Sequence, residues 1–167
     1  MAERGFNVMR RSAALVAASW VWLVTIDCGS DSATLPQRAA YQAVLSGSSE
    51  RPVRANGGSG LATLEVDGNH AQYVVTASSL TAPVTIAQIF IGDASAAAGQ
   101  AVVRLTLTAR ADTIAMGSID LSRPITFNTT TISADSLRSL FERGTAYVNV
   151  YTATYPGGEM RGQIVRR

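Results

Sequence analysis

The chain has 167 residues and a formal net charge of +2, and 16% of its residues are charged. This length fits one domain with a further segment outside it. From Tyr41 onward ten Arg face nine Asp and Glu, and this near-neutral balance excludes the basic patch of a nucleic-acid-binding protein. Fourteen Gly, few aromatic residues and many Thr and Val favour an all-β domain with tight turns.

Residues 1–27 have the features of a signal peptide. Arg4, Arg10 and Arg11 form a basic start, and an apolar run follows from Ser12 to Ile26. This run of 15 residues is shorter than the ~20 residues of a membrane-spanning helix and is typical of a signal peptide. We therefore expect an exported, extracytoplasmic protein, and an uncleaved anchor is the alternative.

Cys28, the only cysteine, lies directly after this apolar segment. In an exported protein a single cysteine has no partner for an internal disulfide. Residues 23–32 resemble a bacterial lipoprotein signal, which implies that a lipid on Cys28 is the only membrane contact. Asp27 departs from that pattern, which prefers a small residue there, and ordinary cleavage near Ser30 is the alternative. Residues 28–38 are small and polar, as in a flexible tether.

Residues 39–167 predict one domain built from short strands. Asp67-Gly68-Asn69 is a hairpin signal between two strands, and Pro156-Gly157-Gly158 supplies a turn before the last strand. Strands that recur roughly every 8–12 residues favour a sandwich or barrel over a parallel sheet. The expected strands cover residues 39–46, 61–67, 72–78, 84–91, 101–108, 114–120, 144–152 and, after the Pro-Gly-Gly turn, the residues up to Ile164.

One helix is predicted, from Ser133 to Arg143. Ser133 is a capping residue, apolar residues recur at i, i+3 and i+4, and Gly144 marks the end. We therefore expect an all-β fold, an antiparallel two-layer β-sandwich of about seven or eight strands with one short helix over one end. The predicted core contains Leu45, Leu64, Val74, Ile89, Ile91, Val103, Leu105, Leu140, Phe141, Val148, Val150 and Ile164.

Several different short motifs are spread along the chain between Tyr41 and Ile164. They include Leu45-Ser46-Gly47, Gly60-Leu-Ala-Thr63, Tyr73-Val-Val75, Gly144-Thr-Ala-Tyr-Val-Asn-Val-Tyr-Thr152 and Gly157-Gly-Glu-Met-Arg-Gly-Gln-Ile164. None is specific alone, but in this order and spacing they resemble the CHRD (chordin) domain family. The resemblance implies an extracytoplasmic, immunoglobulin-like or superoxide-dismutase-like β-sandwich, found in chordin and in many bacterial exported proteins, mostly without known activity.

Three departures from the family pattern concern histidine. The family usually has His-Ile-His where this chain has Gln88-Ile89-Phe90, and a third His where it has Tyr151. Period-two alternation puts Gln88 and Phe90 on one face of their strand, where Tyr151 joins them if the register is correct. His70, the only histidine, follows a turn and is expected to be solvated. Because a soft metal site needs several convergent donors, we predict no metal and no cofactor.

The predicted binding patch is Gln88, Phe90, Tyr151, Asn149, Glu159 and Arg161. Asn149 and Gln163 are expected to satisfy backbone groups at a sandwich edge. Glu159 and Arg161, two residues apart on one strand face, are expected to form a surface ion pair worth at most about 1 kcal/mol. Phe90 and Tyr151 offer either packing at the end of the sandwich or a flat surface for a sugar or a partner side chain.

The sequence supports no catalytic residues. A Ser-His-Asp set would depend on His70, and the Gly-rich residues 56–60 lead into a strand rather than a phosphate-binding helix. We therefore expect no enzyme but a CHRD-type binding module, tethered to the cell envelope or secreted, whose partner is an envelope protein or a glycan. The alternative is a metal-binding or superoxide-dismutase-like redox protein, which the missing histidines disfavour.

Overall fold

The computed structural model describes residues 38–55, 57–110 and 112–167, which all belong to one compact unit. The expected signal peptide, Cys28 and the tether up to residue 37 lie outside the described residues. Within the described part, no helix has both the length and the apolar character that a membrane crossing requires.

The described residues form eleven strands, one 3-10 helix and one α-helix. The strands are β1 (Ala39–Ser46), β2 (Ser59–Asp67), β3 (His70–Ser78), β4 (Val84–Ile91), β5 (Gln100–Arg104), β6 (Thr113–Asp120), β7 (Ile125–Phe127), β8 (Thr130–Ile132), β9 (Ala146–Thr152), β10 (Met160–Gln163) and β11 (Val165–Arg166). The 3-10 helix η1 covers Gly47–Ser49, and α1 covers Ala134–Glu142.

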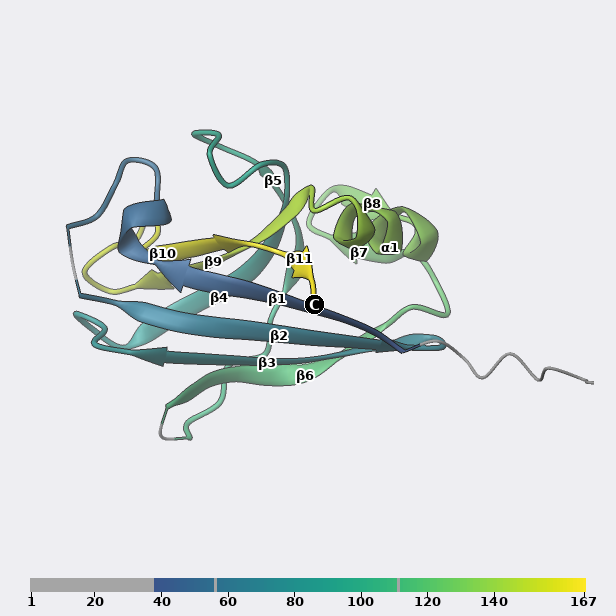
Figure 1. The fold of residues 1–167 in the computed structure, drawn as a ribbon, viewed down its shortest axis with the longest axis horizontal. Coiled ribbons are helices and arrows are strands. Elements are labelled where there is room, and N and C mark those ends of the chain that lie inside the picture. Colours follow the sequence, from purple (N-terminus) through teal and green to yellow (C-terminus); the bar gives the residue numbers. More distant parts are fainter. Residues whose placement is uncertain (1–37, 56, 111) are drawn as a thin grey trace, which may run out of the picture. The chain divides into compact units, whose positions relative to one another are not determined.

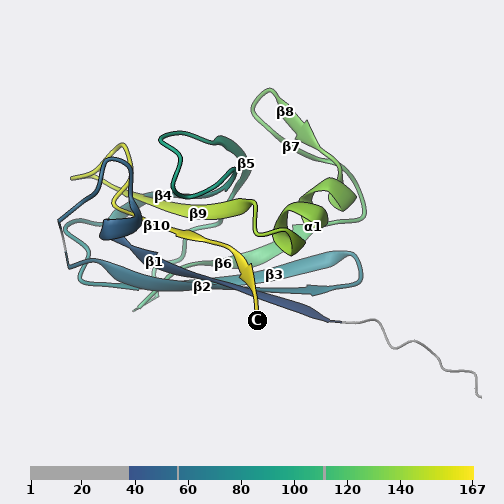
Figure 2. The same ribbon diagram turned by 45° about the horizontal axis from the view of Figure 1, so that its top comes forward.

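The main sheet is antiparallel and runs in the order β5-β4-β9-β10-β1-β2-β3-β6, with β11 also paired to β1. The sheet curls into two facing layers, β5-β4-β9-β10 and β1-β2-β3-β6, which Figures 1 and 2 show from two directions. The hydrogen-bonded pair β10–β1 joins the layers on one side. The fold is thus the predicted all-β, two-layer sandwich with one short helix.

Local signals account for the best-predicted elements. Gly68 has a φ of +53°, which a hairpin turn requires and which glycine adopts at little cost, so β2 and β3 pair from Asp67–His70 to Ser59–Ser78. The Ser133 side chain accepts a hydrogen bond from the backbone N–H of Ser136 and caps α1. Gly144 follows the helix with a φ of +61°.

The core lies between the two layers and under α1. All predicted core residues are buried except Ile91, which is partly buried, and Val74, which is 38% exposed. The prediction for Val74 was wrong because Tyr73, Val74 and Val75 are all apolar, and a period of two cannot show which of them point inward. The structure buries Tyr73 and Val75.

The second half of the predicted strand 101–108 does not continue as a strand in the structure. β5 ends at Arg104, and the chain then leaves β4 and reaches β6 at a single bridge, Leu107–Ala115. The small hairpin β7–β8, whose strands are only three residues each, is also absent from the predicted elements. The alternation of side chains over so short a span is too weak a signal for a strand.

Candidate functional site

Of the six predicted patch residues, five lie on the outer face of β4, β9 and β10, away from the core, and the sixth, Glu159, directly precedes β10. We call the six together the outer patch. They are Gln88, Phe90, Asn149, Tyr151, Glu159 and Arg161. Gln88 pairs with Asn149 across β4 and β9, and Asn149 pairs with Arg161 across β9 and β10. Three adjacent strands therefore carry one polar row across the sheet.

Aromatic rings lie beside this polar row. The ring centroids of Phe90 and Tyr151 are 6.4 Å apart, with their planes at 38°. Phe90 also stacks on Tyr147, its direct cross-strand neighbour, at 5.1 Å and 9°. The Arg161 guanidinium carbon lies 5.0 Å from the Tyr147 ring centroid, within reach of a cation–π contact. The structure thus brings Phe90 and Tyr151 together, with Tyr147 as a third ring that the sequence analysis did not single out.

The outer patch has an accessible part and a buried part. Gln88, Phe90 and Tyr151 are partly exposed. Asn149 and Arg161 are each 2% exposed, and Glu159 is fully buried. Loops, rather than a second sheet, cover the buried members, so a ligand that meets the folded protein contacts the partly exposed side chains.

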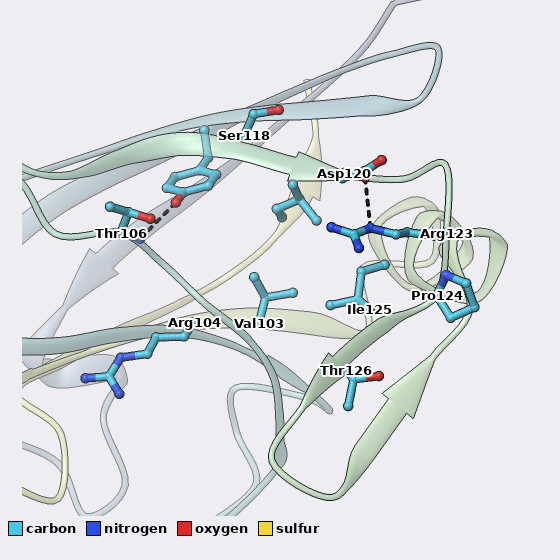
Figure 3. A pocket seen from close by; sticks show the side chains of 11 residues that line it. Val103, Arg104, Thr106, Ser118, Asp120, Arg123, Pro124, Ile125 and Thr126 are labelled. Carbon is cyan, nitrogen blue, oxygen red and sulfur yellow. Dashed lines mark hydrogen bonds and ion pairs between the residues drawn. The ribbon is translucent and has the colours of Figure 1, made fainter.

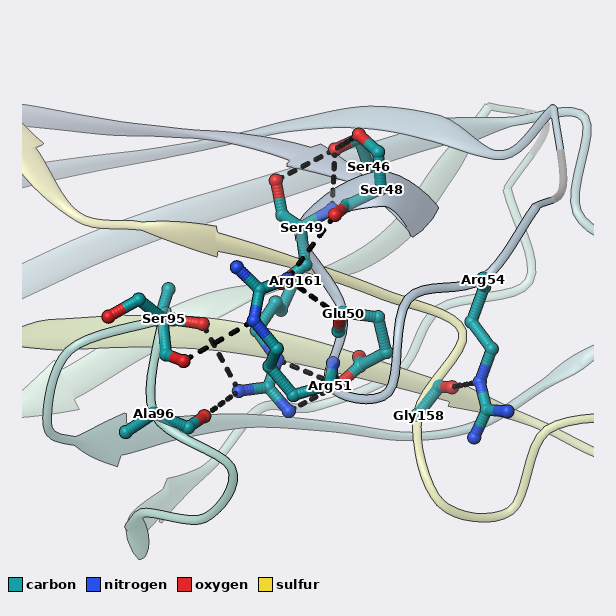
Figure 4. A network of polar contacts seen from close by, with 11 residues as sticks. Ser46, Ser48, Ser49, Glu50, Arg51, Arg54, Ser95, Ala96, Gly158 and Arg161 are labelled. Carbon is teal, nitrogen blue, oxygen red and sulfur yellow. Dashed lines mark hydrogen bonds and ion pairs between the residues drawn. The ribbon is translucent and has the colours of Figure 1, made fainter.

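Arg161 forms a buried ion pair with Glu50, which the sequence analysis did not place in the patch (Figure 4). The Arg161 Nε donates to Glu50 Oε1 at 2.7 Å, and its Nη2 donates to the same oxygen. The Arg161 Nη1 donates to the carbonyls of Ala94 and Ala96 in the loop after β4. One side chain therefore ties the sheet to two covering loops.

The expected surface ion pair between Glu159 and Arg161 is wrong. Both residues are buried, and Glu159 precedes β10 rather than sharing a strand face with Arg161. The Glu159 carboxylate accepts hydrogen bonds from the Thr81 backbone N–H, the Thr81 hydroxyl and the Thr152 hydroxyl. Strand periodicity could not reveal this, because the covering segments come from distant parts of the sequence.

Gln163 behaves as predicted and satisfies backbone groups. Its side-chain nitrogen lies within hydrogen-bond distance of the carbonyls of Gly92, Gly144 and Ala146, and its side-chain oxygen accepts from the Ala94 N–H at 2.6 Å. Asn149 differs, because its side-chain oxygen is buried and has no hydrogen-bond partner among the described residues. Glu50 Oε2 is also buried and unpartnered there.

The side chains of Glu50 and Asn149 both lie close to Gly158. A Cβ atom at Gly158 would be 2.5 Å from Glu50 Oε2 and 3.0 Å from the Asn149 side-chain nitrogen. With a φ of +113°, Gly158 also has a backbone conformation that other residues rarely adopt. The Pro-Gly-Gly turn therefore serves two purposes, chain reversal and close approach to the buried polar groups.

The buried environment changes the acidity of the patch tyrosines. Burial, followed by the negative charge of Glu50, raises the pKa of Tyr151 to about 12. Burial also raises the pKa of Tyr147, while the nearby Arg161 opposes the rise. Both phenols are therefore neutral hydrogen-bonding groups at ordinary pH.

The described residues contain no group of three or more His, Cys, Asp or Glu that could hold a metal ion. His70 starts β3, is exposed, and pairs with Asp67 and Asp120 on the neighbouring strands. It lies on a different strand from every member of the outer patch, and it is solvated as predicted.

A second feature, a cleft of about 400 Å³ between β5 and β6, was not predicted (Figure 3). Among its lining residues are Arg104 and Ser118, on the two strands that flank it. No sequence pattern indicates this cleft, because it depends on where two strands separate.

Comparison with known proteins agrees with the architecture of the domain. The family model described as the CHRD domain matches residues 41–164. No curated protein and no solved structure matches the chain. The matched residues cover most of the sequence and include most of β1, all of β2 to β10 and the whole outer patch. The chain therefore belongs to the CHRD domain family.

Proposed function

We propose that this CHRD domain is a non-enzymatic binding module that acts outside the cytoplasm. Its ligand, an envelope protein or a glycan, stacks on the partly exposed rings of Phe90 and Tyr151, with Gln88 beside them as a hydrogen-bonding group. The observation that carries this proposal is the position of two adjacent aromatic rings over a buried and cross-linked polar layer.

The buried layer explains why this surface suits binding. The contacts of Arg161 with Glu50 and the loop after β4 hold the strands and loops in one arrangement. Phe90 is further held by stacking on the buried Tyr147. A surface whose side chains are already ordered loses less conformational entropy when a ligand binds. Aromatic rings with a polar neighbour suit both sugar faces and protein side chains.

A pull-down from the native envelope with the full chain tests the proposal. We expect a specific protein or polysaccharide to be retained by the wild type and lost with the double variant Phe90→Ser and Tyr151→Ser. The matched control is Val74→Ser, which removes an exposed apolar side chain from β3. Thermal melts of all variants separate loss of binding from loss of folding. Equal retention by the wild type and a folded double variant would refute a role for the two rings.

The proposed location rests on residues 1–38. A basic start, an apolar run, Cys28 and a polar tether follow one another in the order of a lipoprotein signal. Metabolic labelling with a fatty acid is expected to mark the wild type, and Cys28→Ser is expected to abolish the label and release the protein into soluble fractions. A mature chain that begins at Asp31 would contradict the anchor and support secretion.

The redox alternative predicts a bound metal. Protein purified without chelator is expected to contain neither copper nor zinc in stoichiometric amounts. Near-stoichiometric content of either metal would favour a metal-binding role over the proposed one.

A further inference from the structure

The cleft between β5 and β6 lies where the antiparallel pairing between the chain after β5 and β6 stops. Beyond β5 the chain meets β6 through two backbone hydrogen bonds, from Thr108 N to Ile114 O at 3.0 Å and from Met116 N to Thr106 O at 3.1 Å. Continued in the same register, this pairing would next place Arg104 opposite Ser118. In the structure the two strands separate before that pair forms.

The side chain of Tyr73 ends the pairing. The Thr106 N–H donates to the Tyr73 hydroxyl at 2.8 Å, instead of to the carbonyl of Met116 that a regular ladder would supply. Gly117 makes room for this arrangement, because a Cβ atom there would lie 2.6 Å from the Tyr73 hydroxyl oxygen. Tyr73, which reaches over from β3, thus keeps the two strand edges apart.

The edges that remain open present backbone hydrogen-bonding groups to the cleft. Leu105 N donates to Ala87 O on β4, so by alternation the backbone groups of Arg104 face the opposite way, toward β6. Met116 N faces Thr106, and Ser118, two residues later, faces the same side. Among the described residues, neither Arg104 nor Ser118 has a hydrogen-bond partner for these backbone groups.

The cleft between these edges has both apolar and basic lining residues. Val103 and Ile119, each 6% exposed, are the buried apolar residues of its lining, and the exposed Arg104 and Arg123 supply its positive charges. Figure 3 shows Val103, Arg104 and Arg123 around the cleft. Arg123 forms an exposed ion pair with Asp120 at 3.0 Å, and Arg104 has no ion pair within the described residues. The two arginines and Asp120 therefore give the cleft a net charge of +1.

We propose that this cleft binds an extended acidic peptide segment of another protein, which adds as a strand to the open edge of β6. The backbone groups of Ser118 and Arg104 pair with the peptide backbone, as in other complexes formed by strand addition. Alternate peptide side chains face the buried apolar residues and the two arginines. This surface is distinct from the outer patch, and the proposal does not depend on the ligand of that patch.

The probe is the blocked peptide acetyl-Glu-Val-Glu-Val-Glu-amide, titrated into the full chain and followed by backbone amide NMR shifts. We expect saturable shifts centred on Ser118 and Arg104. A version with N-methylated backbone amides keeps every charge but cannot donate hydrogen bonds, and it is expected not to bind. The Lys-Val-Lys-Val-Lys analogue is also expected not to bind.

Protein variants separate backbone pairing from charge. Ser118→Pro removes one N–H that points away from the sheet, a change that edge strands tolerate, and should weaken binding about tenfold. Ser118→Ala keeps that N–H and should bind as the wild type does. Arg104→Glu tests the role of charge even if the proline variant does not fold. It should bind the lysine peptide in preference to the glutamate peptide.

Three results would overturn the proposal. The first is the absence of shifts with the glutamate peptide, and the second is equal binding of its N-methylated version, which would indicate a simple anion site. The third is a dimeric chain that Ser118→Pro makes monomeric in sedimentation velocity, which would assign the edge to a second copy of this protein.

Discussion

Strand β9 is covered on both faces, but by different parts of the molecule and different interactions. On its inner face Ala146, Val148 and Val150 are at most 1% exposed and pack in the apolar core. On its outer face Tyr147 and Asn149 are buried under loops that hydrogen bonds and an ion pair hold in place. Apolar packing tolerates small imperfections, whereas each buried polar group needs a specific partner.

This contrast between the two faces of β9 implies that the structure of the outer face depends on a few residues. Arg161 connects β10 with both Glu50 and the loop after β4, and Gln163 adds further hydrogen bonds to that loop. The inner face distributes its contacts over many apolar side chains. Substitutions on the two faces, added metal ions and alkaline pH test this difference.

The largest effect is expected for Arg161→Met. This change leaves the carboxylate of Glu50 buried without its cation, which typically costs about 3–5 kcal/mol of unfolding free energy. Urea unfolding measures the loss. The matched control is Arg38→Met, which breaks an exposed ion pair with Asp67 at 3.0 Å and should cost at most about 1 kcal/mol.

The double variant Glu50→Leu and Arg161→Met sharpens this test. It removes both charges, so it should recover much of the stability that the single change loses. If Arg161→Met costs no more than the control, the outer face does not depend on this ion pair and the contrast with the core fails.

Neighbouring residues of β4 compare the two faces directly. Ile89 is fully buried on the inner face, and Ile89→Ala should cost about 2–5 kcal/mol through lost burial and a residual cavity. Gln88 is partly exposed on the outer face, and Gln88→Ala should change stability by no more than about 0.5 kcal/mol. Denaturant midpoints at constant m-value give both numbers. Similar losses for the two variants would contradict the assignment of faces.

The third prediction concerns metal binding at the outer patch. Zinc or copper should leave the melting temperature of the wild type unchanged, because a ligand that does not bind the native state cannot stabilise it. The triple variant Gln88→His, Phe90→His and Tyr151→His should gain about 2.7 kcal/mol when free metal is about 100 times its dissociation constant. Thermal melts with and without each ion measure both.

A marked increase in the wild-type melting temperature with either ion would contradict the absence of a soft metal site. If the triple variant stays folded but its melting temperature does not rise with either ion, these three positions are too far apart or wrongly directed to coordinate one metal ion.

The smallest effect is expected from alkaline pH. The folded pKa of Tyr151, about 12, is above the ordinary value of 10.0, so the unfolded chain loses its proton first. The contribution of this group to stability is therefore complete below pH about 10 and is lost as pH rises toward about 12. Urea midpoints across this range should fall less steeply for Tyr151→Phe than for the wild type. Identical slopes would show that the phenol is not shielded as the structure indicates.

Local sequence determined the elements that short-range rules govern. The Asp67-Gly68-Asn69 turn, the Ser133 cap and the strand at 84–91 all appear where the residues predict them, because turn geometry and capping depend on a few adjacent residues. The same alternation predicted which side of β4 and β9 carries the outer patch.

Tertiary structure decided what covers that patch and where the sheet opens. Glu50 meets Arg161 across 111 positions of sequence, and the Tyr73 hydroxyl reaches Thr106 N across 33. No local pattern specifies such contacts, because they arise only when the two layers and their loops close around one core. Alternation along a strand sorts its residues into two faces, but whether the second face is covered depends on segments that fold back from elsewhere in the chain.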